Sequence, residues 1–315
     1  MKVYPLKFRP IYKQRIWGGR KLHEVFGKEL PEGEKIGESW ELTDLPEDKS
    51  VIAHGELAGR TLASGIEEFP KEIMGDEGFS GAFPLLIKLL DCQDVLSVQV
   101  HPDSQTCRRL GEGAPKTENW YIISAEPGAV IYKGLKKGVN KDQFAEAIKE
   151  GTVADTLSKV VVQESECHFL PAGTAHAIGP GLLIVEIQTP SDTTYRVFDW
   201  NRVDDAGKPR ELHIEQALES IHFDQSPGDL PVTRIGRLVE CEYFTIDKGH
   251  QGRNCEVLLS PGEVKTLVIL SGCGMILKPS ADPVDFRAGD CLLIPAAYEG
   301  AVRFTDDTQY LTVTL

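Results

Sequence analysis

The chain contains a group of side chains whose types and spacing suit metal binding. Residues 94–101 (Asp-Val-Leu-Ser-Val-Gln-Val-His) alternate polar and apolar side chains with period two, which is typical of a strand. Ser97, Gln99 and His101 are therefore expected on one face, and Leu96, Val98 and Val100 on the other. Three polar side chains on one strand face suit the lining of a polar cavity, although a strand with one face in water would alternate in the same way.

Two further motifs add a carboxylate and a second imidazole. Pro171-Ala-Gly173-Thr-Ala-His176 follows a short apolar run, so its proline and glycine predict a tight turn that leads the histidine into the next strand. In Lys116-Thr-Glu118 the two charged residues are two apart, so in an extended chain they would share a face. A surface ion pair would have the same spacing.

Together these motifs supply two imidazoles, one carboxylate and one amide oxygen, from His101, His176, Glu118 and Gln99. Such a set suits a first-row divalent metal with a coordination position left open for substrate. Zinc accepts two histidines and a carboxylate, and so does the Fe(II) of facial-triad oxygenases. The donor set alone does not choose between the two metals.

The order of these motifs resembles the type I mannose-6-phosphate isomerases of the cupin superfamily, in particular the short bacterial form. The resemblance extends over nearly the whole chain and is carried by residues 16–19 (I-W-G-G), 36–40, 84–88, 96–103, 116–118, 171–176 and 191–196. Longer relatives have a histidine before the lysine and a proline before the glutamate. Pro115 and Thr117 occupy those positions here, so roles taken from the long enzymes transfer less directly.

The resemblance implies a cofactor and a set of site residues. It implies one Zn²⁺ per chain, held by Gln99, His101, Glu118 and His176, and it names Arg196 as an essential active-site arginine. It also places further residues in the substrate pocket: Trp17, Glu38, Lys88, Ser97, Lys116, Glu186 and Asp192. The implied reaction interconverts D-mannose 6-phosphate and D-fructose 6-phosphate through an enediol.

This chemistry suggests roles for the charged residues. An isomerase must stabilise negative charge on the enediolate and hold a base within reach of the carbon. Arg196 could stabilise the enediolate, which we favour, or bind phosphate. Lys88 and Lys116 are candidates for phosphate binding, with a hydrogen bond from Ser97. A histidine, Lys116, Glu186 or a metal-bound water could be the base. The other six histidines, among them His213, lack a supporting motif and are interpreted as surface or structural residues.

Two alternative functions have the same metal residues. An Fe(II) dioxygenase would keep the histidines and the carboxylate but would not need the lysines and the arginine. A non-catalytic sugar-phosphate sensor would bind ligand without turnover, and it has no need for a complete metal set together with Arg196. The full combination of residues therefore favours the isomerase.

These residues require a strand-rich framework. Short apolar runs between 30 glycines and 19 prolines predict many strands, which favours a mainly β fold of cupin or jelly-roll barrels. The expected strands are 84–90, 94–101, 128–133, 158–163, 166–171, 182–189, 193–200, 237–246, 255–260, 264–270, 290–295 and 308–314. The expected helices are 140–151, with a capping box from Asn140 and Gln143, then 210–221, and more weakly 20–27 and 64–74.

Two domains are expected. The segment 223–233, rich in proline, glycine and aspartate, predicts a boundary between a catalytic metal-binding domain at residues 1–225 and a smaller cupin-like β domain at residues 234–315. Residues 166–172 resemble residues 290–296, which suggests an internal duplication. In that alignment Gly300 matches His176, so the C-terminal unit is expected to be metal-free.

Composition limits the partners and the location. Of the 315 residues, 34 are Lys or Arg and 48 are Asp or Glu, so the formal net charge is −14. Such a surface repels nucleic acid and anionic membranes, and an anionic substrate needs a local cluster of cations. Seven widely spaced cysteines without a C-x-x-C pair predict free thiols in a reducing compartment. With no apolar run of membrane length and no secretory signal, we expect a cytoplasmic protein, monomeric or dimeric.

Overall fold

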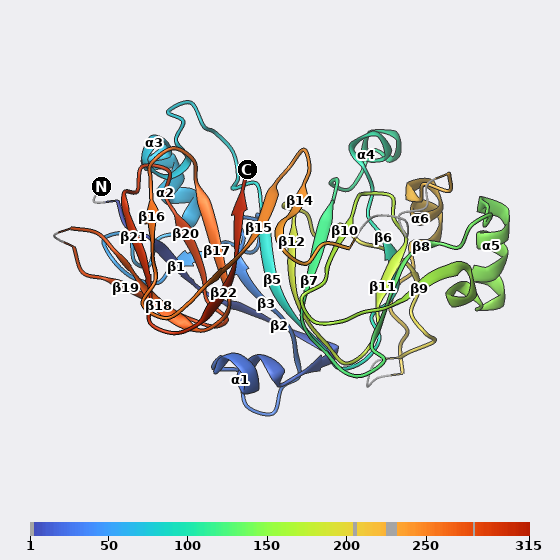
Figure 1. Cartoon of the computed structure of the whole chain (residues 1–315). Coiled ribbons are helices and arrows are strands. Elements are labelled where there is room, and N and C mark those ends of the chain that lie inside the picture. The colour runs from blue at the N-terminus through green and yellow to red at the C-terminus, as the bar shows by residue number, and fades with distance from the viewer. Residues whose placement is uncertain (1–2, 204–206, 225–231, 280) are drawn as a thin grey trace.

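The computed structural model describes residues 3–203, 207–224, 232–279 and 281–315. Within these ranges the fold is mainly β, as expected, and every strand pairing is antiparallel. Four sheets are present. Figure 1 shows the strands of the C-terminal part gathered on one side of the molecule and the sheets of the N-terminal part on the other.

Two of the sheets come from residues 11–198. The six-stranded sheet contains, in spatial order, β10 (Cys167–Leu170), β7 (Glu118–Ala125), β12 (Leu182–Gln188), β5 (Leu86–Cys92), β3 (Ile36–Leu42) and β2 (Ile11–Gly19). The five-stranded sheet contains β13 (Tyr195–Phe198), β6 (Val98–Val100), β11 (His176–Ile178), β8 (Val130–Leu135) and β9 (Leu157–Val161). A hydrophobic cluster with Trp17, Trp120 and Ile131 takes residues from both sheets.

The other two sheets are built mainly from the C-terminal part. The seven-stranded sheet contains β14 (Gly236–Glu240), β15 (Thr245–Gln251), β22 (Thr308–Thr314), β17 (Lys265–Ser271), β20 (Cys291–Ile294), β1 (Leu6–Arg9) and β4 (Val51–Ile52). The four-stranded sheet contains β16 (Glu256–Leu259), β21 (Gly300–Phe304), β18 (Cys273–Leu277) and β19 (Val284–Arg287). Strands β1 and β4 thus join a sheet of C-terminal strands.

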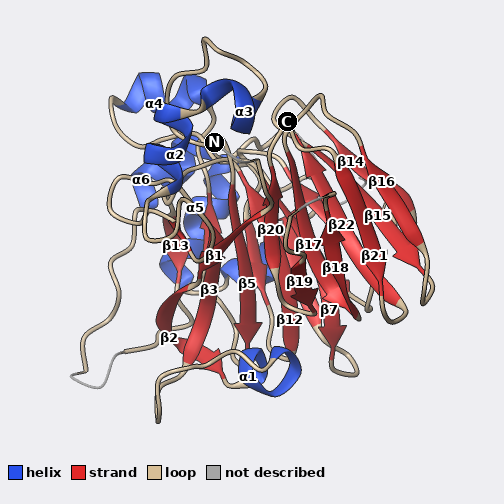
Figure 2. Ribbon diagram, turned by 90° about the vertical axis from the view of Figure 1, so that its left-hand side faces the viewer, coloured by secondary structure: helices blue, strands red, loops and turns tan. Residues whose placement is uncertain are grey.

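Short helices flank the sheets, and several of them lie together at one edge in Figure 2. They are α1 (Lys21–Phe26), α2 (Leu62–Glu68), α3 (Pro70–Met74), α4 (Ser104–Leu110), α5 (Lys141–Glu150), the 3-10 turn η1 (Val153–Thr156) and α6 (Ile214–Ser220). The predicted capping box of α5 is present, because Asn140 and Gln143 bond each other's backbone N–H groups. None of the helices described is long and apolar enough to cross a membrane.

Several predicted boundaries were wrong. The expected strand 94–101 is confined to β6 at Val98–Val100. The predicted alternation of side chains between two faces therefore does not extend to the residues before Val98. Leu96 packs in a different cluster from Val98 and Val100. The expected strand 237–246 is a hairpin of β14 and β15, and the expected helix 64–74 is broken between α2 and α3 at Pro70, which starts the second helix.

The expected helix 210–221 begins only at Ile214. The four residues before it are not helical: the side chain of Arg210 bonds Asp199, and the backbone N–H of His213 donates to the carbonyl of Arg196. Leu212, in this non-helical stretch, is 40% exposed.

The repeated segments occupy equivalent positions in their strands. Strands β10 and β20 each start at the cysteine of the repeat and end just before its proline. The proposed boundary at 223–233 falls largely on residues 225–231, outside the described residues. The division into residues 1–225 and 234–315 stays a prediction.

Candidate metal centre and substrate pocket

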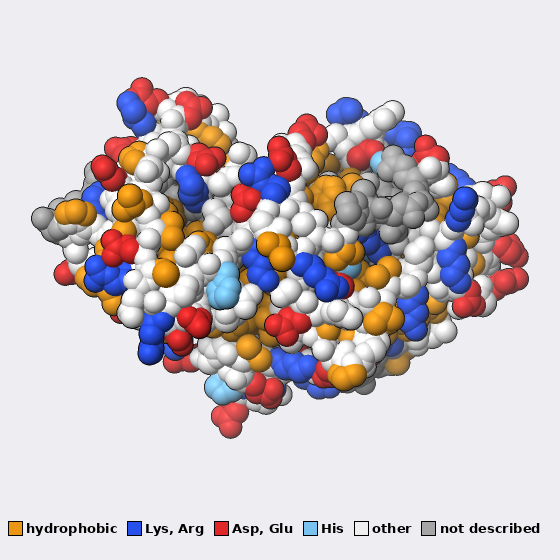
Figure 3. All heavy atoms as spheres, viewed as in Figure 1, with side chains coloured by type: hydrophobic (Ala, Val, Ile, Leu, Met, Phe, Trp, Pro, Cys, Tyr) orange, Lys and Arg blue, Asp and Glu red, His pale blue; other side chains and the backbone are white. Residues whose placement is uncertain are grey.

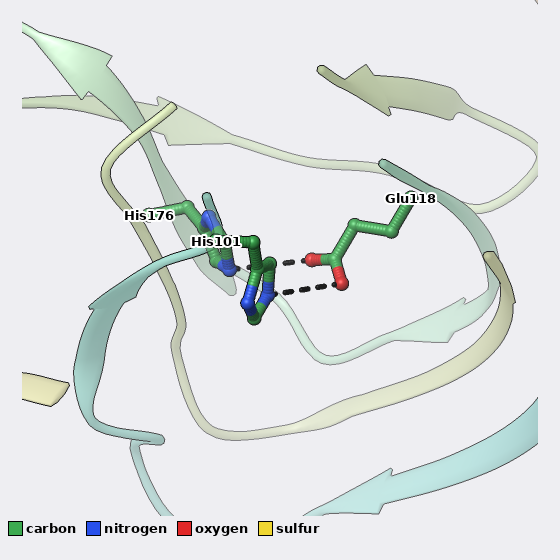
Figure 4. Close-up of side chains that lie close together, drawn as sticks. All are labelled: His101, Glu118 and His176. Carbon is green, nitrogen blue, oxygen red and sulfur yellow. Dashed lines mark ion pairs between the residues drawn. The ribbon is translucent and has the colours of Figure 1, made fainter. Parts of the chain in front are cut away.

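The predicted metal residues come from three strands of the two N-terminal sheets. His101 directly follows β6, Glu118 begins β7 and His176 begins β11. Their ligand atoms all lie within 4.8 Å of one another (Figure 4). Nε2 of His101 is 3.2 Å from Oε2 of Glu118, and Nε2 of His176 is 3.2 Å from Oε1. All three side chains are buried, so the fold places the three donors of the predicted cluster together.

The hydrogen bonds of the histidines leave the correct nitrogen atoms available. Nδ1 of His101 lies 2.8 Å from the carbonyl oxygen of Thr193, and Nδ1 of His176 lies 2.8 Å from that of Thr174. A carbonyl only accepts, so each Nδ1 carries the proton and donates it. Each Nε2 is then an unprotonated nitrogen that faces Glu118 and can bind a metal through its lone pair. Metal-ligating histidines are oriented in the same way by their second nitrogen.

Three ligand atoms of this cluster make no hydrogen bond, although Oε2 of Glu118 forms an ion pair with Lys116. Nε2 of His101 and both carboxylate oxygens of Glu118 are buried without a hydrogen bond, although they stand close to one another. Burial lowers the pKa of His101 to about 3 and also lowers that of His176, so both imidazoles are neutral. Burial alone would raise the pKa of Glu118, but the nearby charge of Lys116 holds it well below its ordinary value. Neutral imidazoles and an ionised carboxylate are the forms that bind a divalent metal.

Gln99 lies beside this cluster. It is directly opposite His176 in the β6–β11 pair, and its amide nitrogen is 3.3 Å from Nε2 of His176. The predicted ligand atom is the amide oxygen, so its participation requires the amide to turn over. The two amide orientations have nearly the same shape.

Lys116 and Glu118 share a face as predicted. Nζ of Lys116 is 2.9 Å from Oε2 of Glu118, and the two side chains are 4% and 0% exposed. The pair is therefore buried, which excludes the alternative of a surface ion pair.

The environment of Glu186 is set by sheet register. Glu186 on β12 lies directly opposite Lys88 on β5 and Trp120 on β7. Its Oε1 accepts from Nζ of Lys88 at 2.9 Å, and its Oε2 accepts from the indole N–H of Trp120 at 3.1 Å. Burial alone would lower the pKa of Lys88, but the charges of Glu186 and Glu38 hold it above its ordinary value. The carboxylate within an apolar strand thus has a buried, charged partner.

A second carboxylate, Glu38 on β3, is held from two sides. It accepts from the indole N–H of Trp40 at 2.6 Å and from Nε of Arg15 at 2.8 Å. Burial would raise the pKa of Glu38, but the charges of Lys88 and Arg15 hold it below its ordinary value. Strand β2, which carries Arg15 and Trp17, approaches closely because of Gly37: a Cβ there would lie 2.6 Å from the Arg15 side chain and 2.7 Å from the Trp17 ring.

Arg196 on β13 differs from Lys88 and Lys116, because no ion pair joins it to a carboxylate of the described residues. Its Nε donates to the hydroxyl of Ser97 at 3.3 Å and its Nη1 to the carbonyl of Glu211 at 2.9 Å. Arg196 and Asp192 both line the pocket but do not form an ion pair with each other.

These side chains surround one cavity of about 470 Å³. All nine of the predicted site residues outside the His–Glu–His cluster line it: Trp17, Glu38, Lys88, Ser97, Gln99, Lys116, Glu186, Asp192 and Arg196. The lining has five cationic side chains (Arg15, Lys88, Lys116, Arg196 and Arg210) and three carboxylates (Glu38, Glu186 and Asp192). An excess of two positive charges in a chain of net charge −14 favours an anionic ligand.

The sequence reasoning missed several lining residues, notably Arg15, Arg210 and His213. Arg15 directly precedes the I-W-G-G motif at residues 16–19, and this position could have indicated that Arg15 lines the pocket. Arg210 and His213 were missed because the sequence predicts a helix at 210–221, and because no motif distinguishes His213 from a surface or structural histidine. Outside the pocket, Figure 3 shows charged side chains of both signs distributed over the visible face.

The fold and the site together define a class of protein: a mainly β protein with a buried His–Glu–His cluster beside a cationic pocket. Residues 6–130 match the family model of the phosphomannose isomerase type I catalytic domain. The chain is 35% identical over 308 residues to mannose-6-phosphate isomerase ManA of Bacillus subtilis, covering 94% of both chains. It is 34% identical over 297 residues to the mannose-6-phosphate isomerase of Streptococcus mutans, covering 92% of both. The chain belongs to the type I phosphomannose isomerase family.

Solved structures agree with this assignment. The crystal structure of the mannose 6-phosphate isomerase from Bacillus subtilis superposes with a TM-score of 0.88 at 30% identity, covering 99% of each chain. A putative mannosephosphate isomerase from Archaeoglobus fulgidus gives 0.80 at 20% identity, covering 99% of this chain and 98% of that one, which supports the fold alone.

Proposed function

We propose that the pocket performs a zinc-dependent aldose–ketose isomerisation. The chain is a mannose-6-phosphate isomerase, as its family membership and its relatives over more than nine-tenths of its length establish. Its reaction interconverts mannose 6-phosphate and fructose 6-phosphate. The observation that carries the proposed site is the set of buried ligand atoms of His101 and Glu118 that make no hydrogen bond, beside His176 at a cationic pocket.

Zinc is the metal we propose, one per chain. His101, Glu118 and His176 would hold it, with the amide oxygen of Gln99 as a fourth ligand. A crystal structure of a distant mannose 6-phosphate isomerase, 16% identical with a TM-score of 0.75, is bound with zinc and yttrium, which supports this choice. When bound, the metal would polarise substrate oxygens and orient the sugar.

The remaining steps belong to the side chains of this chain. A proton must move between C2 and C1 of the sugar, and we assign this transfer to Lys116 or Glu186. Nζ of Lys116 is already held beside Glu118, and the Glu186 carboxylate is fixed by Lys88 and Trp120. Arg196 supplies positive charge to the anionic substrate. Trp17, Glu38, Lys88, Ser97 and Asp192 would contact and orient the sugar.

The wider architecture is part of the proposal. We infer cupin-type barrels for both halves, with the metal held only by the N-terminal one. Strand β11 begins at His176, whereas β21 begins at the aligned Gly300, which offers no ligand.

Seven free cysteines support a cytoplasmic location.

The test is a coupled isomerase assay on mannose 6-phosphate before and after chelation, and again after addition of Zn²⁺ or Fe²⁺. We expect activity to disappear with the chelator and to return best with zinc. His176→Ala should abolish both zinc content and activity, whereas His250→Ala, an exposed histidine on β15, should change neither. Full activity in the metal-free protein would disprove the metal proposal. An inactive protein that is folded and zinc-loaded would disprove the proposed site.

A further inference from the structure

The non-helical segment before α6 contributes to the pocket lining. Residues 210–213 (Arg-Glu-Leu-His) include two of the lining residues, Arg210 and His213. The segment is attached to β13 by the backbone of Arg196: the N–H of His213 donates to the Arg196 carbonyl at 2.8 Å, and the Arg196 N–H donates to Nδ1 of His213 at 3.4 Å. Arg196, Arg210 and His213, which we call the arginine end of the pocket, are thus held together.

The guanidinium of Arg210 is held in place by two of its nitrogen atoms, and the third makes no hydrogen bond to the described residues. Its Nε and Nη2 form a fork on the two oxygens of Asp199, at 2.7 Å for the Nε contact. Within the part of the chain that the structure describes, Nη1 has no hydrogen bond. Asp199 also accepts from Arg202 at 2.6 Å, so one buried carboxylate serves two arginines. Arg202 also forms an ion pair with the exposed Asp94. The fork on Asp199 holds the guanidinium of Arg210 in a fixed orientation beside the pocket.

His213 presents a donor. Because the Arg196 N–H donates to its Nδ1, that nitrogen carries the lone pair, and the proton of the neutral ring is on Nε2. No described residue accepts from this Nε2. A neutral imidazole oriented in this way can donate one hydrogen bond to an anion.

Arg210 has Asp199 as its counter-anion, but Arg196 has none among the described residues. Arg196 has no ion pair with a carboxylate of the described residues, and burial followed by the charge of Arg210 lowers the pKa of Arg196. By contrast, the two pocket lysines already have carboxylate partners: Lys88 has Glu186, and Lys116 has Glu118. Like charges kept together beside a cavity are stabilised when an anion binds between them.

The position of this end suits one end of a sugar phosphate. Arg196 is directly opposite Gln99 across β13 and β6, and Gln99 is directly opposite His176 across β6 and β11. Two strand spacings separate the backbone of Arg196 from that of His176, about 10 Å. A six-carbon chain with a terminal phosphate has a length of this order.

We propose that Arg210 and His213, together with Arg196, bind the phosphate of the substrate and direct the C1–C2 end of the sugar toward the His101–Glu118–His176 cluster. This assignment rests on the proposed function. It moves the phosphate from the predicted Lys88 and Lys116 to the arginine end, and it makes Arg210 and His213 determinants of specificity for phosphorylated sugars.

The experiment measures phosphate binding and catalysis separately in Arg210→Gln, His213→Ala and Arg237→Gln. Arg237 lies on β14, is exposed and pairs with Asp247 and Glu240, so its variant is a matched control for charge loss. Calorimetry with inorganic phosphate gives Kd, a coupled assay gives kcat and KM for mannose 6-phosphate, and elemental analysis gives zinc content. Because losing one hydrogen bond to a charged group typically costs roughly 10- to 100-fold in affinity, we expect that loss for phosphate in Arg210→Gln. His213→Ala should lose about 10-fold.

Both variants should raise KM by similar factors while zinc content stays unchanged, and Arg237→Gln should match the parent protein. Unchanged phosphate affinity and KM in Arg210→Gln and His213→Ala would overturn the assignment, as would a fall in kcat alone. If Arg210→Gln does not fold, His213→Ala carries the same test. Phosphate binding that depends on Arg210 in a protein without isomerase activity would contradict the proposed function but support the subsite.

Discussion

Gln99 lies directly opposite His176 in the antiparallel pair β6–β11, with its amide nitrogen 3.3 Å from Nε2 of His176. On its other side Gln99 is directly opposite Arg196 on β13. One row of the five-stranded sheet therefore joins the candidate metal centre to the arginine end of the pocket, and Gln99 is its middle member.

Replacement of Gln99 tests whether its amide binds the metal. We expect Gln99→Ala to weaken zinc affinity by about ten-fold or more, since loss of even an outer-shell partner typically costs 10–100-fold. The loss in His176→Ala should be larger, because an imidazole is the stronger ligand. Competition with a chromophoric chelator measures both affinities. Equal zinc affinity in Gln99→Ala and the parent protein would restrict the site to the two histidines and Glu118.

The buried pair of Lys88 and Glu186 should be needed for stability as well as for the pocket. Breaking it with Lys88→Met leaves the Glu186 carboxylate without its charged partner, so we expect the free energy of unfolding to fall by about 3–5 kcal/mol. The double variant Lys88→Met with Glu186→Gln should recover much of this loss, because neither charge remains. Urea unfolding measures all three proteins. A double variant no more stable than Lys88→Met would show that the charge is not the cause.

Arg196 should contribute to catalysis rather than to folding. Its guanidinium has no carboxylate partner among the described residues, so Arg196→Ala should leave the unfolding midpoint within experimental error of the parent. We expect kcat/KM for mannose 6-phosphate to fall by about 10²–10³, the usual loss for one preorganised charge or donor. Arg196→Lys should recover only part, because it lacks the planar fork. Wild-type kinetics in Arg196→Ala would be the contradicting result.

Lys133 should make stability depend on alkaline pH. Lys133 is 2% exposed and lies directly opposite His176 across β8 and β11. Burial lowers its pKa from 10.5 to about 8. Between these values the unfolded chain binds the lysine proton and the folded chain does not, so the free energy of unfolding rises with pH in this window. The increment is about 3 kcal/mol at most.

The comparison with Lys133→Met isolates this effect from other titrating groups. At pH 7 the variant should be the more stable protein, and its advantage should shrink as the pH rises from 8 to 10.5. Lys149→Met, which removes a lysine whose side chain is 72% exposed, is the control and should show no such trend. A stability difference between Lys133→Met and the parent that stays constant from pH 7 to 10.5 would contradict the prediction. Urea unfolding at intervals of one pH unit measures it.

Much of the candidate site could be predicted because its signals are local. Period-two alternation places Gln99 between Val98 and Val100, and those two valines pack together in one cluster while Gln99 lines the pocket. The spacing of Lys116 and Glu118 places both on one face for the same reason. The capping residues Asn140 and Gln143 determine the start of α5 without help from the rest of the chain.

The pairing of residues far apart in the chain depends on how the strands and loops assemble. Sheet register sets Glu186 opposite both Lys88 and Trp120, and no local pattern encodes the pairing of β12 with β5 and β7. The segment 210–213 lies in a predicted helix, yet it is not helical, and its bonds to Asp199 and Arg196 bring Arg210 and His213 to the pocket. Local sequence patterns specify which residue types are available and which face of a strand they occupy. Contacts between residues far apart in the chain decided the rest, because they outweigh the small free energy differences of local propensity.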